Sequence, residues 1–208
     1  MTEQGSLETA GRAGASWATT ALVLMDLQRP IVEMIDGGGV VGRLARVLAA
    51  AREAGVHVIH VKLGFAPGYR DLDPANRIFE AIRSSARFVG DADEDGVVPE
   101  LAPLPDEVVV TKKRVSAFVA SPLEATLRSS RISHVVLAGL STSGVVLSTL
   151  RHAADLDFAI SVLSDGCADR DAEVHRVLVE KVFPRQADVL TCEEWITSLA
   201  GDAARRGG

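Results

Sequence analysis

Six short runs of β-branched and other apolar residues, separated by segments with helical periodicity, constrain the fold of this chain most strongly. Most runs are continuously apolar rather than alternating, which is typical of strands covered on both faces of a parallel sheet. Strand and helix signals alternate along the chain, which predicts an α/β fold with right-handed crossovers. We therefore expect a three-layer α/β/α sandwich of the Rossmann type around a six-stranded parallel sheet. The predicted strands are Thr20–Met25, Val56–Lys62, Glu107–Thr111, His134–Gly139, Phe158–Leu163 and Ala187–Leu190.

Local signals mark several helix boundaries and the limits of the domain. An apolar stripe from Val40 to Ala51 predicts a helix that ends near Gly55, a residue type favoured just beyond helix C-termini. Ser121–Glu124 and Thr191–Glu194 have the spacing of a capping box and predict two helix starts. We predict one folded domain over residues 17–200, flanked by disordered tails at residues 1–16 and 201–208.

Composition excludes several classes of function. The chain has 208 residues, of which 47% are hydrophobic, so one domain with a sizeable core is expected. Lys and Arg number 22 against 28 Asp and Glu, a net charge of −6, which argues against nucleic acid or an anionic membrane as a partner. No apolar run approaches the roughly 20 residues that span a bilayer. Two cysteines without a metal-binding motif indicate a cytoplasmic protein.

The segment from Gly64 to Asp106 is much longer than an ordinary connection between two strands. Segments of this length usually form lids or other functional loops. Its sequence predicts one helix, over Arg77–Arg87. We expect four of its residues to line a pocket or contact a substrate: Phe65, Tyr69, Asn76 and Arg77.

Reactive side chains follow three of the predicted strands. Asp26 ends the first strand, Lys112 the third, and the small polar loop Gly139–Gly144 follows the fourth. Ligands of open α/β sheets bind beyond the carboxyl ends of the strands, so these residues are candidates for one site. A carboxylate, an ammonium and a helix N-terminus could together exchange a proton and stabilise negative charge.

Each of these features also has a purely structural interpretation. Asp26 could cap the following helix, Lys112 could belong to the solvated charge run that continues to Arg114, and the small residues of the loop could serve a tight turn. Cys167 is interpreted as a buried structural thiol. His57 and His60 lie three residues apart on a strand, so they point to opposite faces and do not predict a shared metal site.

Three motifs resemble the isochorismatase-like, or cysteine hydrolase, superfamily. They are DLQ at the first strand, K-x-R-x-SAF at the third and G-x-S-T-x-x-x-V-x-S-T at the fourth, within a similarity that covers roughly residues 18–192. The resemblance implies a pocket at the carboxyl edge of the sheet, a homodimer or higher homo-oligomer, and catalytic roles for Asp26 and Lys112. It also places a non-proline cis peptide at Leu140–Ser141. The Asp-x-His arrangement of metal-dependent relatives has no match after the first strand, so we predict no metal and no other cofactor.

The chain departs from the family pattern at one position. The family thiol lies three residues after the loop threonine, Thr142, and this chain has Val145 there. Valine cannot act as a nucleophile, so an acyl-enzyme cannot form at this position. Isochorismatases proper have glycine there, and their Asp is thought to protonate a vinyl ether. Asp26 could act likewise, provided that burial raises its pKa more than Lys112 lowers it.

These observations predict a cofactor-independent hydrolase of a small organic molecule with a vinyl ether, amide or other C–N bond. Asp26 would be the acid and base, and Lys112 its electrostatic partner. The alternative is a catalytically silent member of the superfamily that binds a small molecule. A hydrolase that uses a hydroxyl of Ser141, Thr142 or Ser143 as nucleophile is a third possibility, and Ser143 is also a candidate for substrate binding.

Overall fold

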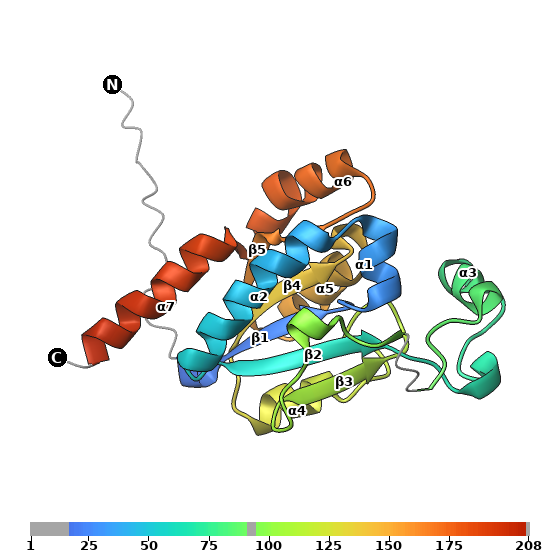
Figure 1. Cartoon of the computed structure of the whole chain (residues 1–208), viewed down its shortest axis with the longest axis horizontal. Helices are drawn as coiled ribbons and strands as arrows, with labels where there is room; N and C mark the ends of the chain where they lie inside the picture. Colours follow the sequence, from blue (N-terminus) through green and yellow to red (C-terminus); the bar gives the residue numbers. More distant parts are fainter. Residues whose placement is uncertain (1–16, 91–94, 207–208) are drawn as a thin grey trace.

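The computed structural model describes residues 17–90 and 95–206, and these form a single six-stranded sheet with helices on both faces (Figure 1). All neighbouring strands are parallel, in the order β3-β2-β1-β4-β5-β6, which confirms the predicted α/β/α sandwich. The strands are β1 (Thr20–Met25), β2 (His57–Leu63), β3 (Val108–Lys112), β4 (His134–Leu140), β5 (Ala159–Ala168) and β6 (Asp188–Leu190).

The helices divide the core into two apolar clusters, one on each face of the sheet. In the first cluster, α2 and α7 pack against Leu22 and Leu24 of β1, and in the second, α4 and α5 pack against Ala21 and Val23. Alternate residues of one strand thus enter opposite clusters, as the pleat of a strand requires. The helices are α1 (Arg29–Ile35), α2 (Gly38–Glu53), α3 (Arg77–Ser85), α4 (Leu123–Ser129), α5 (Leu147–Asp155), α6 (Ala172–Val177) and α7 (Cys192–Arg206).

The C-terminal helix differs from the sequence prediction. Thr191 and Glu194 form the predicted capping box, since each side chain accepts a hydrogen bond from the other's backbone N–H. Helix α7 then continues to Arg206, past residue 200 where the folded domain was expected to end. Burial of Trp195 and Leu199 in the first cluster anchors this helix against α2. The tail predicted at residues 1–16 lies outside the described residues.

The helix predicted at Ser121–Glu124 also begins differently. The Ser121 hydroxyl accepts a hydrogen bond from the Leu123 N–H, but Glu124 faces Arg128 one turn later at 3.9 Å. The reciprocal capping box is therefore replaced by an exposed ion pair. Within the described part of the chain, no helix has the length and apolar character needed to cross a membrane.

Strand β5 is longer than its sequence predicted, and its extension shapes the carboxyl edge of the sheet. The predicted end was Leu163, whereas the strand runs to Ala168 and brings Cys167 opposite Gly139 of β4. The register between β4 and β5 shifts between Leu137 and Gly139, which is the mark of a bulge. This irregularity lies directly before the loop that the sequence identified as a candidate site.

Gly139 is the residue whose replacement the backbone tolerates least at this edge. Its φ is +146°, and a Cβ there would lie 2.1 Å from the carbonyl oxygen of Met25 on the neighbouring strand β1. Only glycine permits this approach of the two strands. The strand end that precedes Leu140 and Ser141 is thus fixed by its close contact with the strand end that precedes Asp26.

We expect Gly139→Ala to destabilise the protein by about 3 kcal/mol or more, because of the backbone clash and the unfavourable φ. The matched control is Gly42→Ala in α2, where a Cβ meets nothing within 4 Å and helix propensity predicts a gain of about 1 kcal/mol. Urea unfolding of both variants measures the difference. Equal stability of Gly139→Ala and the wild type would show that the two strand ends are not held as described.

Candidate active site

Two charged side chains that the sequence singled out form a buried ion pair at the carboxyl edge of the sheet. Asp26 follows β1 and Lys112 ends β3, and Asp26 Oδ2 lies 2.9 Å from Lys112 Nζ. Their side chains are 8% and 3% exposed. Asp26 has a left-handed backbone with φ of 56°, and its N–H donates to the Val61 carbonyl of β2 at 2.9 Å. The backbone therefore turns at Asp26 and aims its carboxyl across β2 toward β3.

The two carboxyl oxygens of Asp26 have different surroundings. Oδ2 faces Lys112, whereas Oδ1 is buried without a hydrogen-bond partner among the described residues. Burial raises the pKa of Asp26 above its ordinary value of 3.8, and this effect exceeds the opposing charge and hydrogen bond of Lys112. A carboxyl of this kind keeps its proton to a higher pH than an exposed one. Its direction of shift is the one that a general acid requires.

The loop after β4 is held in place by its own hydrogen bonds and by groups from the following segment. The Leu140–Ser141 peptide bond is cis, at the position the family resemblance implied. Ser141 precedes a π-helical turn, Thr142–Val146, and its hydroxyl accepts from the Gly144 N–H at 3.2 Å. Because Met25 pairs with Gly139, this loop begins beside the end of β1 and hence beside Asp26.

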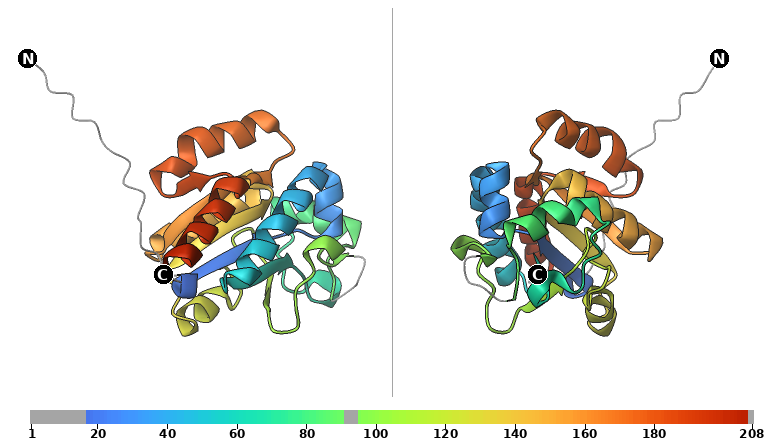
Figure 2. Two further views of the ribbon diagram at one scale, coloured as in Figure 1. Left: turned by 60° about the vertical axis from the view of Figure 1, so that its left-hand side comes forward. Right: turned by 90° about the vertical axis from the view of Figure 1, so that its right-hand side faces the viewer.

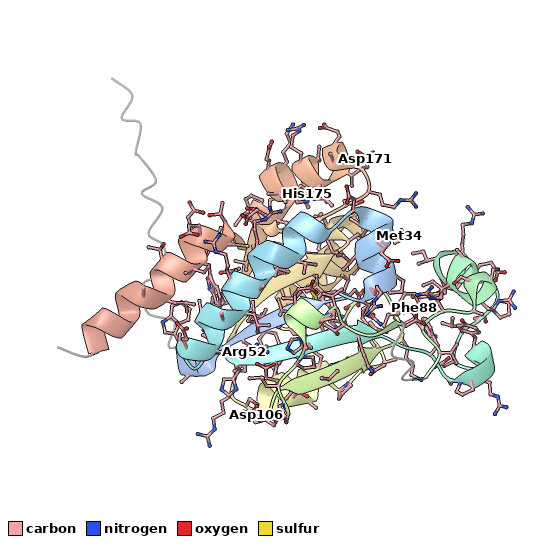
Figure 3. All side chains as sticks on the ribbon, in the orientation of Figure 1. Met34, Arg52, Phe88, Asp106, Asp171 and His175 are labelled. Carbon is pink, nitrogen blue, oxygen red and sulfur yellow. The ribbon has the colours of Figure 1, made fainter. Side chains whose placement is uncertain are left out.

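Two further residues fix the π-helical turn from outside. The Ser143 N–H donates to Asp169 Oδ2 at 2.7 Å, and Thr142 Oγ1 lies 2.8 Å from His175 Nδ1. Figure 3 shows His175 on α6. Burial lowers the pKa of His175, with the Asp169 charge acting in the opposite direction. Thr142 itself is fully buried, so its hydroxyl serves this contact. The turn is thus anchored to α6 and to the residues just before it.

Val145 occupies the inner side of the π-helical turn. It is 2% exposed and belongs to the second apolar cluster together with Met25 and Val61. The nearby Cys167 also lies in this cluster, and burial raises its pKa to about 12. A thiol with that pKa is almost wholly protonated near neutral pH and is a poor nucleophile. Burial likewise raises the pKa of Cys192, on the other face of the sheet.

The structure places the four candidate residues of the long segment in different surroundings. Phe65 is buried, with its ring 5.6 Å from Phe79 and 5.8 Å from Tyr69. The Tyr69 hydroxyl donates to the Arg87 carbonyl at 2.7 Å. Asn76 is half-buried just before α3, and Arg77 is exposed at its first turn. These contacts build the segment itself, and a role in substrate binding stays a prediction for all four.

Sequence reasoning missed Gln28, which completes the DLQ motif. Its amide imitates a backbone group at the end of β2: Oε1 accepts from the Leu63 N–H at 2.7 Å, and Nε2 donates to the Leu63 carbonyl at 3.1 Å. Nε2 also donates to the Asp95 carbonyl at 2.6 Å. Gln28 therefore locks the turn that carries Asp26 against β2. The DLQ motif was the signal that could have identified Gln28, whereas its partners cannot be predicted from one sequence because they are backbone groups.

Within residues 17–90 and 95–206, no three His, Cys, Asp or Glu side chains gather in a way that could hold a metal ion.

The fold and the site together define a protein of the isochorismatase-like class. Residues 20–194 match the family model described as the isochorismatase domain. Over 87% of its length the chain is 31% identical to an uncharacterized isochorismatase family protein, YecD, from Escherichia coli O157:H7, covering 96% of that protein. The chain belongs to the isochorismatase family.

Relatives with more specific names are also similar. Ureidoacrylate amidohydrolase RutB from Variovorax paradoxus is 30% identical over 87% of this chain and 81% of its own length. A probable inactive nicotinamidase from Arabidopsis thaliana is 28% identical over 88% of this chain and 98% of its own length. The crystal structure of a cysteine hydrolase from Pseudomonas syringae pv. phaseolicola shares the fold, with a TM-score of 0.83 and 23% identity, over 90% of this chain and 95% of that one.

The surroundings of Asp26 predict how stability responds to pH once Lys112 is removed. Lys112→Met deletes the group that lowers the Asp26 pKa, so this pKa should rise further above 3.8. A carboxyl whose pKa is higher in the folded than in the unfolded protein stabilises the fold at low pH, and stability falls as pH rises through the window between the two values. We expect a cost of about 3–5 kcal/mol near neutral pH.

Urea unfolding of wild type and Lys112→Met across this pH window provides the measurement. The double variant Asp26→Asn/Lys112→Met serves as the control, since it has no carboxyl to titrate and should lose the added pH dependence. A pH profile of Lys112→Met that runs parallel to that of the wild type would contradict the assignment of Lys112 as the group that controls Asp26.

Proposed function

We propose that this protein is a cofactor-independent hydrolase of a small organic molecule, with Asp26 as general acid and base and Lys112 as its electrostatic partner. One observation carries the proposal: Asp26 is a buried carboxyl with a raised pKa, one oxygen of which contacts an ammonium while the other has no hydrogen-bond partner among the described residues. Such a group combines a proton that is kept to a higher pH than in an exposed carboxyl with a cation that stabilises the carboxylate left behind. A surface carboxyl does neither.

For a vinyl ether, the proposed reaction has two proton transfers. Protonated Asp26 gives its proton to the terminal alkene carbon, and the positive charge that results is shared between the other alkene carbon and the ether oxygen. Lys112 stabilises the Asp26 carboxylate. Water then adds to the cationic carbon and returns a proton to Asp26, and the hemiketal breaks into a carbonyl compound and an alcohol. One water is consumed and Asp26 ends in its starting state.

Val145 supports this route over an acyl-enzyme. An aliphatic side chain at the position of the family thiol offers no nucleophile, and the thiol of Cys167 is buried with a pKa of about 12. The name of the relative ureidoacrylate amidohydrolase RutB supports including C–N bonds among the substrates. For such a bond, water would be the nucleophile and Asp26 its base. A homo-oligomer and a cytoplasmic location stay predictions.

Replacing Asp26 tests the proposal most directly. Asp26→Asn keeps the shape of the side chain but removes its proton, so we expect a loss of about 100-fold or more in kcat/KM. A panel of vinyl ethers, amides and ureas assayed with the wild type identifies the substrate first. Because the acid form is required for vinyl ethers, wild-type activity on them should fall as pH rises through the raised pKa of Asp26.

Asp36→Asn is the matched control, since Asp36 is an exposed carboxyl with a left-handed backbone, φ 55°, close to that of Asp26. It should retain full activity. Equal turnover by Asp26→Asn and wild type would refute the role of Asp26. Saturable binding of a panel member without turnover would instead identify the silent binding protein that the sequence left open.

The interpretation of position 145 has its own test. We expect Val145→Cys to react with an activated ester and to release about one equivalent of leaving group in a burst, because the family resemblance implies that the nucleophilic thiol belongs at this position. The control is Val146→Cys, at the next buried valine of the same turn. Equal labelling of both variants, or of neither, would show that residue 145 does not occupy the thiol position of the family.

A further inference from the structure

The segment 64–90, called the arm below, lies beyond the carboxyl edge of the sheet where Asp26 and Lys112 meet. Figure 1 shows its helix α3 projecting from this edge, and the right-hand view in Figure 2 shows it in front of the strands. Within the arm the buried Phe65 contacts Phe79 and Tyr69, and Phe65 and Phe79 belong to the first apolar cluster of the sheet. The arm is therefore joined to the sheet edge by apolar packing, and its polar contacts there involve the turn after β3.

Asp71 is the arm residue that contacts the turn after β3. Its carboxylate accepts the Ala66 N–H at 3.0 Å and pairs with Lys113 Nζ. Its carbonyl accepts from Arg114 Nη2 at 3.0 Å. Burial would raise the pKa of Asp71, but the hydrogen bonds from Lys113 and Ala66 together lower it. The arm thus holds the turn through both the side chain and the backbone of one residue.

The Arg114 side chain contacts the arm, and its backbone carbonyl contacts Lys112 of the Asp26–Lys112 ion pair. Its guanidinium donates from Nη1 to the Lys113 carbonyl at 2.6 Å and from Nη2 to Asp71. Its carbonyl oxygen accepts from Lys112 Nζ at 3.0 Å. The Lys112 ammonium is therefore set between two oxygens, Asp26 Oδ2 and the Arg114 carbonyl. A shift of that carbonyl would move the ammonium relative to the carboxyl.

We infer that Arg114 is a positioning residue. Its carbonyl holds Lys112 beside Asp26, and its guanidinium connects the position of this carbonyl to the contact between the arm and the β3 turn. A planar guanidinium suits this link because it spans two carbonyl oxygens in a fixed geometry, which a lysine ammonium cannot reproduce. The catalytic consequence rests on the proposed function: contact of the arm with the turn would adjust the acid. The linkage itself concerns the free protein and can be measured without a substrate.

The test is the titration of the Asp26 carboxyl carbon by NMR, with Lys112 as the charged group in contact with it. Arg114→Lys keeps the positive charge but cannot bind the Lys113 and Asp71 carbonyls together. The Lys112 ammonium is then held less firmly beside Asp26, so the Asp26 pKa should rise by about half a pH unit or more. If Arg114 acted only through its charge, lysine would restore the wild-type titration. Arg83→Met, which removes an exposed arm arginine paired with Glu80, is the control and should change nothing.

Asp71→Ala separates linkage from direct electrostatics by its sign. Removing a negative charge favours ionisation of a nearby carboxyl, so direct electrostatics predicts a lower Asp26 pKa. Loss of the arm contact predicts a higher one, because Lys112 is held less firmly. If Asp71→Ala folds poorly, Asp71→Asn replaces it in the test, because it keeps an acceptor for the Ala66 N–H. It should shift the Asp26 pKa in the same direction.

A rise in both the Arg114 and the Asp71 variants supports the inference. A lower or unchanged Asp26 pKa in the Asp71 variants overturns it, whatever the Arg114 variant shows. Neither result depends on turnover. Failure of the proposed hydrolysis therefore leaves this test standing, and failure of the linkage leaves the Asp26→Asn assay unaffected.

Discussion

The rest of the site depends on one buried carboxyl that lies beside one buried ammonium. Asp26 and Lys112 are both almost fully removed from water, and desolvation of two charges costs several kcal/mol each unless their geometry compensates. The compensation here is incomplete, because Asp26 Oδ1 has no partner among the described residues and burial dominates its pKa. This incomplete compensation is compatible with the proposed function, in which Asp26 gives up a proton and regains it.

The surrounding backbone holds this pair in register from three directions. Gln28 binds the Asp26 turn to the end of β2 by imitating a backbone amide, and Gly139 lets β4 approach β1 more closely than any other residue would. The β3 turn fixes Lys112 through the Arg114 carbonyl. Each contact involves backbone atoms near a strand end, so the sheet itself fixes the position of the site. Loops alone would not position two charges this closely.

The fold and the central pair follow from the sequence, and the contacts around them do not. Continuous apolar runs predicted every strand, and a reactive residue at the end of a buried run predicted Asp26 and Lys112. The extension of β5 was missed because Ser164, Asp165 and Gly166 interrupt the apolar run, although a bulge accommodates them. Asp169 and His175 were missed because they act through space on the π-helical turn. Tyr69 carries no sign that its hydroxyl binds the Arg87 carbonyl.

Val145 is consistent with this same balance between burial and charge. It lies in the apolar cluster that contains Met25, which precedes Asp26, and Val61, whose carbonyl accepts the Asp26 N–H. The family resemblance implies a thiol at this position, and valine there has no titratable group and extends this apolar cluster. Less polar surroundings favour the neutral carboxylic acid over the carboxylate. In the proposed function, valine at position 145 therefore excludes an acyl-enzyme and keeps this cluster apolar, which favours an acid over a nucleophile.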